Sequence, residues 1–384
     1  MQLIPSDVIG SCLTSSSVKD EQAEVAPETD LLISRQPDPV GHSESPQATF
    51  SQTSLTARIY DQYAKLFTWK TESVSTKELN CLGLPNLGMT CYISSTLQSL
   101  LTLSCFVQEV HNQLLLWSSN PKLQIYREFV EVGVCRSSNM KTRKKMSLSS
   151  FKRAVAMVNS NFQGDKQNDA HEFLLCVLDM LKTPESGWNY TCPVRDHIAL
   201  ELLSTRTCRG CGEQSLMLEE FLSLSLDLVP EGSVSRCLQE YLKESKLEYM
   251  CECGAKKSFL KRSFFTLPNV LILHLKRFRL TKTLRVKKVE SPIKLTEELV
   301  LNEEFMTTED TTARYSLVSI ISHVGSTADS GHYISDGVYR NKDMGDVTDC
   351  WLTYDDEDVS PTTGASVCQK RATTAFLLFY EKQH

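Results

Sequence analysis

Apolar residues recur at helical spacing in the first half of the patterned region, which begins near Leu82. Four of them follow the spacing i, i+4, i+7 and i+8 in the stretch 91–103: Ile93, Leu97, Leu100 and Leu101. Five more recur in the stretch 169–182: Phe173, Leu174, Val177, Leu178 and Leu181. Residues at this spacing share one face of an α-helix. The pattern therefore predicts two amphipathic helices, each with one buried face.

The second half of the chain changes to a strand pattern. Apolar and β-branched residues dominate four short runs: "NVLILHLKRF", "YSLVSIISHV", "YISDGVY" and "TAFLLFY". Runs of this length and composition are typical of β-strands. Helices followed by strands predict an α+β fold, in which a helical lobe packs against a mostly antiparallel sheet.

Residues 1–79 differ from the rest in composition. They are rich in Ser, Gln, Thr, Asp and Pro, as in "RQPDPVGHSESPQATFSQTS", and show no sustained period. Such a segment cannot bury enough apolar surface to offset the entropy lost on ordering. We therefore predict that residues 1–79 are mostly disordered, with a short helix near "TARIYDQYAKLFTWK", and that one domain spans residues 80–384.

Composition narrows the class of protein. The 384 residues carry a net charge of -6, with 41% hydrophobic and 23% charged residues, which is ordinary for a globular protein. This mild acidity gives no reason to expect nucleic acid as a partner. No window approaches the roughly 18 to 20 apolar residues of a membrane helix, and "MQLIPSDVIG" does not resemble a secretory signal. We expect a cytoplasmic and/or nuclear monomer whose 14 cysteines are reduced.

Two basic runs stand out, "KTRKK" at residues 141–145 and "RVKK" at residues 285–288. The first has the composition of a nuclear localisation signal, and either run could contact a target protein. A solvated basic surface needs no partner, and we favour that interpretation for both.

Cys91 occupies a helix start. Thr90 is a candidate N-cap residue, and Gly88 permits the turn that leads into the helix. A thiol in the first helical turn lies at the positive end of the helix dipole, which favours the nucleophilic thiolate. A cysteine taken alone, however, is more often a small core residue.

Two other stretches could supply partners for this thiol. His332 lies between Gly331 and Tyr333, where a loop enters a strand, and imidazole is the usual base for a cysteine nucleophile. Asp355 and Asp356 follow an aromatic strand, and such a base is typically oriented by a carboxylate. Each stretch also has an ordinary interpretation, as a packed histidine and as a solvated acidic turn.

Paired cysteines suggest a metal site. Cys208 and Cys211 form C-x-x-C, and Cys251 and Cys253 form C-x-C. Two thiolate pairs at the tips of antiparallel strands suit a tetrahedral structural zinc. The alternative is a degenerate site that packing alone holds together.

Long stretches of the chain resemble the ubiquitin-specific protease family of papain-like cysteine hydrolases. The stretches agree with the family in order: "GLPNLGMTCYISSTLQSL", "LPNVLILHLKRF", "YSLVSIISHVGSTADSGHYISDGVY" and "WLTYDDEDV". The resemblance covers residues 82–382. It implies a helical thumb lobe, a palm made of antiparallel strands, and a β fingers subdomain at roughly residues 200–265.

The resemblance also assigns catalytic roles. Cys91 matches the nucleophile, His332 the general base and acid, and Asp355 the residue that orients His332. Asp356 is an adjacent carboxylate that can share this role, and Asn86 matches the side chain that stabilises the oxyanion. The chain departs from the family at Met89 and Ser94, where asparagine is more common. Because neither position supplies the nucleophile, base or principal oxyanion donor, we expect only modest effects on rate.

Further residues match positions that bind the C-terminal tail of ubiquitin. By spacing alone, Asp169 and Glu172 form a helix capping box. By resemblance, they grip arginines of the tail through charge-assisted pairs, with Gln167 a weaker candidate. Small residues such as Ser330 and Gly331 suit a narrow tunnel for the terminal Gly-Gly, with Tyr333 as a wall.

The fingers of the family carry a zinc site at their tip, which the four cysteines match imperfectly. The second pair is one residue short, and Gly254 stands where the last cysteine is usual. A C-x-C pair can bind zinc in a tighter geometry. We expect no cofactor for catalysis and regard a structural zinc as possible.

The resemblance implies a thiol-dependent deubiquitinase that cuts the (iso)peptide bond after the last glycine of ubiquitin. Its partners would be ubiquitin and ubiquitinated proteins, without nucleic acid or membrane. Two alternatives remain open. One is a catalytically weak ubiquitin-binding scaffold. The reasons to consider it are the departures from the family at Met89, at Ser94 and in the short cysteine pair. The other is a hydrolase for a different modifier that ends in Gly-Gly.

Overall fold

A computed structural model describes residues 79–112, 124–182, 191–281, 286–307, 312–327, 330–340 and 350–383. All of them belong to the unit Gln52–His384. The predicted disordered segment and its short helix lie outside the described residues, except for position 79. The described part contains no helix that is both long and apolar enough to cross a bilayer.

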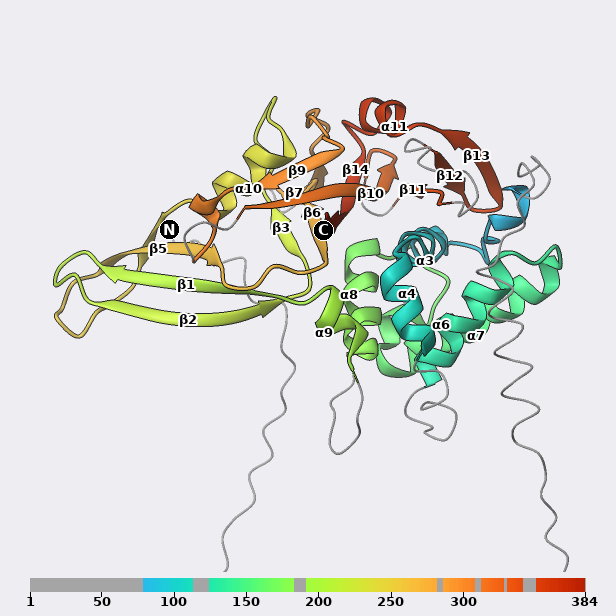
Figure 1. The fold of residues 1–384 in the computed structure, drawn as a ribbon, viewed down its shortest axis with the longest axis horizontal. Coiled ribbons are helices and arrows are strands. Elements are labelled where there is room, and N and C mark those ends of the chain that lie inside the picture. Colours follow the sequence, from blue (N-terminus) through green and yellow to red (C-terminus); the bar gives the residue numbers. More distant parts are fainter. Residues whose placement is uncertain are drawn as a thin grey trace, which may run out of the picture. The chain divides into compact units, whose positions relative to one another are not determined.

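A helical lobe forms the first part of this unit (Figure 1). Its α-helices are α3 (Cys91–Thr102), α4 (Ser104–Asn112), α6 (Gln124–Arg136), α7 (Lys141–Val158), α8 (Ala170–Leu181) and α9 (Pro193–His197). Two short 3₁₀ helices join them, η1 (Asn80–Leu82) and η3 (Ser160–Phe162). Both helices predicted from periodicity are confirmed, as α3 and α8. They begin and end within a residue of the predicted stretches.

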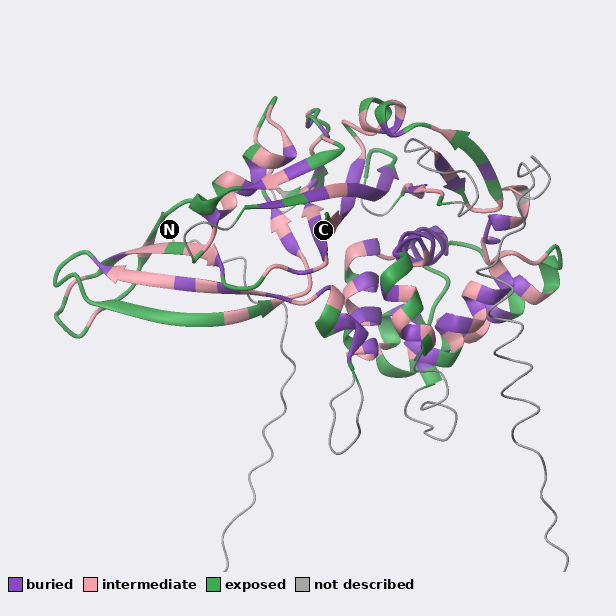
Figure 2. Ribbon diagram, in the orientation of Figure 1, coloured by how far each residue is buried: buried purple, intermediate pink, exposed green. Residues whose placement is uncertain are grey.

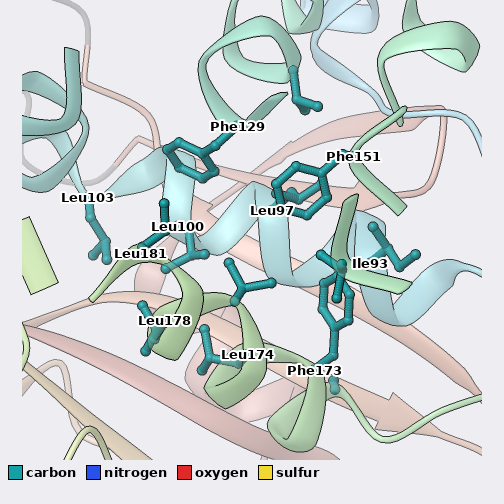
Figure 3. Packing of buried hydrophobic residues seen from close by; sticks show 14 of the residues in the cluster. Ile93, Leu97, Leu100, Leu103, Phe129, Phe151, Phe173, Leu174, Leu178 and Leu181 are labelled. Carbon is teal, nitrogen blue, oxygen red and sulfur yellow. The ribbon is translucent and has the colours of Figure 1, made fainter. Parts of the chain in front are cut away.

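The apolar stripes of α3 and α8 face each other in the core of this lobe. Ile93, Leu97 and Leu100 of α3 lie close to Leu174 and Leu178 of α8, with aromatic rings from α6 and α7 around them (Figure 3). Every one of these side chains is at most 2% exposed. Burying a leucine or isoleucine side chain contributes roughly 1.5–3 kcal/mol, so this contact fixes the position of α3.

A large sheet forms the palm beside the helical lobe. It has eight strands, with β13-β12-β11-β10-β14-β6-β3 in order and β9 paired with β10. The pairs are antiparallel except β3 with β6. Its strands are β3 (Leu224–Leu226), β6 (Val270–Leu275), β9 (Glu298–Leu301), β10 (Ala313–Val324), β11 (His332–Val338), β12 (Trp351–Asp355), β13 (Asp358–Thr362) and β14 (Ala375–Lys382). The four predicted strand runs are β6, β10, β11 and β14.

Helix α3 lies directly on this sheet because small side chains meet at the contact. The Ser99 hydroxyl lies 3.0 Å from that of Ser335 on β11 and 2.9 Å from that of Ser319 on β10. A Cβ at Gly337 would lie 2.8 Å from the Thr102 hydroxyl, so a larger residue would push the helix away. This close approach places the helix start at Cys91 beside the strand start at His332.

A second sheet of four strands extends from the palm (Figure 1). Its order is β2-β1-β5-β4. Its strands are β1 (Leu200–Cys208), β2 (Gln214–Phe221), β4 (Ser245–Glu248) and β5 (Lys257–Phe264). It occupies the segment where the resemblance places the fingers. We call it the fingers sheet.

The fingers sheet is covered only in part. On one face, Leu202 of β1 and Phe264 of β5 are paired in register and join a second hydrophobic cluster. Strand β2, in contrast, is exposed along most of its length (Figure 2). The remaining elements are the hairpin of β7 (Phe278–Leu280) and β8 (Val286–Lys288), with α10 (Val234–Leu242), α11 (Gly364–Lys370) and η4 (Glu303–Phe305).

Candidate active site

Cys91 is the first residue of α3 and is 3% exposed. Thr90 occupies the N-cap position, but its hydroxyl does not cap the helix. Instead, this hydroxyl accepts a hydrogen bond from the Leu87 N–H at 2.8 Å and donates to Oδ1 of Asn86 at 3.1 Å. The amino end of α3 therefore has no side-chain cap from Thr90, and its dipole acts on the thiol and on any carbonyl beside it.

The side chain of Asn86 organises the turn ahead of Cys91. Its Oδ1 accepts from the backbone N–H groups of Gly88 at 3.0 Å and Thr90 at 3.1 Å. The turn requires a φ of +125° at Gly88, which a residue without Cβ adopts readily. Because the turn closes through backbone groups on either side of Met89, the exposed methionine at that position is compatible with it.

The other end of the Asn86 amide points to the far side of the site. Its Nδ2 donates to Oδ2 of Asp356 at 2.8 Å. An amide nitrogen carries two hydrogens, so one N–H is left for a second acceptor. This arrangement holds the amide in a fixed orientation.

His332 lies between the thiol and a carboxylate. Its Nε2 is 2.6 Å from Oδ1 of Asp355. Because Asp355 occupies Nε2, Nδ1 is the nitrogen left for the sulfur of Cys91. Interaction with the Cys91 side chain, followed by that with Asp355, raises the pKa of His332 to about 9, although burial opposes the shift. The imidazole is therefore protonated at neutral pH.

Asp356 has a different set of contacts from Asp355. Its Oδ2 lies 3.9 Å from Nε2 of His332 and accepts the hydrogen bond from Asn86. Its backbone has a φ of +51°, and its carbonyl accepts from the Leu84 N–H at 2.9 Å. Burial raises the pKa of the Asp356 carboxyl. The geometry thus makes Asp355 the partner of the histidine, and Asp356 the link between the Cys91 and His332 segments.

The start of α8 carries the two acidic residues expected to bind a tail. Oδ1 of Asp169 accepts from the N–H groups of His171 at 2.8 Å and Glu172 at 2.9 Å, so Asp169 is a true N-cap. Burial raises the pKa of Asp169, and these two hydrogen bonds oppose the shift. Glu172 is exposed. Capping uses only Oδ1 of Asp169. The second oxygen of Asp169 and the carboxylate of Glu172 therefore remain for a cationic ligand.

Gln167 holds the residue before His332 from two sides. Its Nε2 donates to the Gly331 carbonyl at 2.6 Å, and its Oε1 accepts from the Gly331 N–H at 3.1 Å. A Cβ at Gly331 would lie 2.2 Å from Nε2 of His323, so only glycine fits there. From sequence, Gln167 is only a weaker candidate, because an uncharged side chain in a loop carries no pattern.

Tyr333, expected as a tunnel wall, lies mostly in the core. It is 6% exposed, and its ring centroid is 4.8 Å from that of His323 and 5.8 Å from that of Phe376. A ligand would therefore meet little of its surface.

Two half-buried histidines connect the start of α8 to the palm. The rings of His171 and His274 on β6 stack with centroids 4.0 Å apart. His171 lies 2.9 Å from the Ser223 hydroxyl, and His274 lies 3.0 Å from that of Ser225. Burial lowers the pKa of both rings, that of His171 to about 4. Both are therefore neutral at physiological pH.

The four paired cysteines meet at the tip of the fingers sheet. Their sulfurs all lie within 4.8 Å of one another. The separation is 3.6 Å between Cys208 and Cys253 and 3.8 Å between Cys211 and Cys251. Tetrahedral zinc with Zn–S bonds of about 2.3 Å requires S···S separations of about 3.8 Å. The short C-x-C pair therefore does not prevent convergence, and the four cysteines could hold a structural zinc.

The turns that carry these cysteines are built for close approach. Gly212 and Gly254 follow the two pairs with φ of +75° and +87°. Backbone N–H groups, first that of Cys211 and then that of Gly210, lower the pKa of the Cys208 thiol to about 6. The Cys208 thiol therefore readily becomes the thiolate that binds a metal. For Cys211 the Glu213 N–H lowers the pKa, but hydrogen bonds with the neighbouring sulfurs outweigh it and raise the pKa.

Comparison with known proteins places the chain in a family. A family model described as "Ubiquitin carboxyl-terminal hydrolase" matches residues 82–380. Ubiquitin carboxyl-terminal hydrolase 37 of Canis lupus familiaris is 32% identical over 265 residues, which are 61% of this chain and 27% of the relative. The Homo sapiens protein of that name is 35% identical over 225 residues, 51% and 23% of the two chains. The chain thus spans about a quarter of the length of these curated relatives.

Solved structures share the fold. The SAGA Ubp8/Sgf11/Sus1/Sgf73 DUB module bound to ubiquitin aldehyde matches with a TM-score of 0.68 and 24% identity, covering 88% of this chain and 77% of that one. The module bound to monoubiquitin also has a TM-score of 0.68 and 24% identity, with coverage of 87% and 76%. The α+β papain-like fold is confirmed. The chain belongs to the ubiquitin carboxyl-terminal hydrolase family, within its group of ubiquitin-specific proteases.

Proposed function

We propose that the chain is a thiol-dependent deubiquitinase that hydrolyses the (iso)peptide bond after the C-terminal glycine of ubiquitin. One observation carries this proposal. The Cys91 side chain at a helix start interacts with the His332 ring, whose Nε2 lies 2.6 Å from Oδ1 of Asp355. A nucleophile, a base and an orienting carboxylate in this order are the working parts of a cysteine hydrolase.

In the first step, the Cys91 thiolate attacks the carbonyl carbon of the terminal glycine. The negative charge moves to the carbonyl oxygen, where the free N–H of Asn86 and the Cys91 backbone N–H can stabilise it. The C–N bond then breaks, and the departing amine takes the proton that His332 carries. The products are a thioester on Cys91 and a free amine.

In the second step, water replaces the amine. Neutral His332 accepts a proton from the water as its oxygen attacks the thioester carbon. The C–S bond breaks, which restores the thiolate beside the protonated imidazole and releases ubiquitin with a free carboxylate. Asp355 keeps the ring oriented through both steps.

The tail of ubiquitin would lie between α8 and the His332 loop. Glu172 and the open oxygen of Asp169 would pair with its arginines. Gly331, held by Gln167, keeps the path beside His332 narrow enough for Gly-Gly and too narrow for larger side chains.

The globular body of ubiquitin would rest on the uncovered face of the fingers sheet. Register places Leu203, Leu216 and Leu218 on this face, and Leu216 and Leu218 are 64% and 47% exposed. Glu220 shares the face and forms an ion pair with Lys182 just beyond α8. The face is therefore turned toward the helical lobe. Exposed apolar side chains in such a patch mark an interaction surface.

We also propose one structural zinc at Cys208, Cys211, Cys251 and Cys253. With four protein ligands, no position would remain for a water, so the metal would stabilise the tip of the fingers sheet. Catalysis by Cys91 and His332 needs no cofactor.

The proposed setting is the cytoplasm and/or nucleus, with the chain acting as a monomer on ubiquitinated proteins. Thiols that must bind zinc and attack substrate require a reducing compartment.

Ubiquitin that carries an electrophile at its C-terminus tests the proposal. We expect covalent capture by the native chain and none by Cys91→Ala. Ubiquitin that binds without capture would support the scaffold instead. Capture only by probes built on other Gly-Gly modifiers would move the substrate to that class.

A further inference from the structure

Two lysines from the basic runs of the sequence are buried. Lys144 on α7 is 5% exposed, and Lys288 on β8 is 6% exposed. Their neighbours Lys145 and Lys287 are exposed, as expected for a solvated surface. The expectation of a solvated surface is therefore wrong for one lysine in each run. A buried ammonium group is costly unless its hydrogens are bonded, so each of these lysines needs a structural reason.

Lys144 bonds to the segment that leads into the Cys91 turn. Its ammonium donates to the carbonyl oxygens of Cys81 and, at 2.7 Å, Gly83. These residues lie at the end of η1, which packs beside β13 (Figure 1). Lys144 thus ties helix α7 to the backbone just ahead of the nucleophile.

The segment held by Lys144 presses against the turn that carries the acidic pair. A Cβ at Gly83 would lie 2.2 Å from the Glu357 carbonyl oxygen, which shows how closely the two backbones approach. The next residue, Leu84, donates its N–H to the Asp356 carbonyl at 2.9 Å. Two residues further, Asn86 donates to the Asp356 side chain. A continuous chain of contacts therefore runs from Lys144 to the Asn86 amide.

Lys288 makes the equivalent contact on the other side of the site. Its ammonium donates to the carbonyl oxygens of His323 at 2.7 Å and Gly325 at 2.5 Å. Gly325 has a φ of +130°, and a Cβ there would lie 2.7 Å from the Gly331 Cα. Lys288 thus secures the backbone against which Gly331, the residue before His332, is packed.

We propose that Lys144 and Lys288 are positioning residues of the catalytic centre. Each lysine donates to two carbonyls, spaced i and i+2, on the backbone beside one catalytic element. Lys144 sets the position of the Asn86 amide and Lys288 that of the His332 ring. This role rests on the proposed hydrolase function. It adds two residues that touch neither the substrate nor the reacting atoms.

The test for Lys144 compares Lys144→Met with Lys145→Met, which changes the exposed neighbour in the same way. The substrate is ubiquitin with a fluorogenic amide at its C-terminus. We expect Lys144→Met to lower kcat by about 10- to 100-fold, since a displacement near 1 Å costs up to about 10²-fold. KM, and the Kd for ubiquitin measured in a Cys91→Ala background, should stay within twofold. Lys145→Met should match the native chain.

Gly83→Ala reaches the same contact without removing a charge. Its Cβ would separate the backbone from Glu357, so we expect a loss of kcat that resembles that of Lys144→Met. A folded Lys144→Met or Gly83→Ala protein with native kcat would overturn the role of Lys144. Equal losses in kcat and in affinity for ubiquitin would also overturn it.

The test for Lys288 compares Lys288→Met with Lys287→Met. A displaced His332 loses part of its contact with Cys91. We therefore expect kcat to fall and the alkaline limb of kcat/KM to move from about 9 toward lower pH, with Lys287→Met unchanged. An unchanged alkaline limb in folded Lys288→Met protein would refute the role of Lys288.

A measurement that needs no enzymatic turnover can test this inference even if the proposed function fails. If the native chain hydrolyses no modifier, the proposed function fails. The Asn86 side-chain amide and the His332 ring can still be followed by NMR. Shifts of the former in Lys144→Met and of the latter in Lys288→Met, absent from the neighbouring controls, would support the positioning roles. Unmoved resonances would reject them.

Discussion

At the scale of single residues, the site depends on the interaction between Cys91 and His332. Cys91 supplies the largest part of the rise in the pKa of His332, and Asp355 adds to it. The histidine therefore holds a proton at neutral pH because a sulfur lies beside it, and it can deliver that proton to a leaving amine. Neither residue would behave in this way alone.

This coupling can be measured directly. Removing the sulfur in Cys91→Ala should lower the pKa of His332 from about 9 toward its ordinary value of 6.5, with Asp355 preventing a complete return. NMR titration of the ring reports the shift, and Cys105→Ala, which removes an exposed thiol elsewhere, is the control. An unchanged His332 pKa in Cys91→Ala would contradict a thiol–imidazole contact.

Gly331 permits a sharp steric prediction. In Gly331→Ala the new Cβ would collide with the buried His323 ring and shift the backbone before His332. We expect kcat/KM on a ubiquitin substrate to fall by about 10²-fold. Gly164→Ala is the matched control, because a Cβ there meets nothing within 4 Å. A folded Gly331→Ala protein with native kcat/KM would contradict the steric role of Gly331.

At the scale of elements, the fingers sheet depends on its tip. Strands β1 and β2 extend from the palm with one side of β2 unpaired, and the four cysteines join the β1–β2 turn to the β4–β5 turn. A metal there would connect two hairpins that also meet through the pairing of β1 with β5 and through the Arg206 side chain over the Tyr249 ring. The alignment of the exposed apolar face would then depend on the metal.

Metal content and ubiquitin binding should therefore change together. Elemental analysis of the native chain should find about one zinc, and Cys251→Ser should lose it. We expect weaker binding of ubiquitin by this variant but normal alkylation of Cys91, because the catalytic pair lies outside the fingers sheet. Cys105→Ser should keep both zinc and affinity. A folded native protein that contains no zinc would contradict the proposed metal site.

At the scale of the whole molecule, two groups of histidines set opposite limits on stability. His171 and His274 are half-buried and neutral, so below pH 6.5 the unfolded chain binds protons that the folded chain does not, for His171 down to about pH 4. Stability falls as the pH drops through this range. For His332 the folded pKa is raised, so its contribution is complete below 6.5 and lost as the pH rises through about 9.

The acid limit can be tested by substitution in the stacked pair. Replacing His171 with phenylalanine keeps a ring against His274 but removes a group that must stay neutral. The fall in melting temperature between pH 6.5 and 4 should be smaller in His171→Phe than in the native chain. The exposed-site variant Lys145→Met should keep the native slope. Equal slopes in all three proteins would show that the pair does not govern acid stability.

Periodicity predicted the elements well because the core imposes it. Helices α3 and α8 turn their large apolar residues to the core at the helical period, and strands β10 and β14 are buried in nearly continuous, mostly apolar runs. The meeting of Cys91 with His332 came from resemblance, since no local pattern encodes a contact between distant segments.

The positions that sequence reasoning misjudged share one cause. Lys144 and Lys288 have the same letters as their exposed neighbours, and only the carbonyl groups around them distinguish a buried ammonium from a solvated one. Thr90 is likewise a helix-cap residue by type, but the Asn86 turn engages its hydroxyl first. Polar side chains take their roles from partners that folding supplies, and hydropathy does not record those partners.

Strand β2 has a practical consequence for anyone who handles this protein. An edge strand with exposed leucines and unpaired backbone N–H and C=O groups can pair with a strand of a neighbouring copy. Purified chain without ubiquitin should therefore become turbid or form large particles as it is concentrated. Adding ubiquitin before concentration should keep the solution clear.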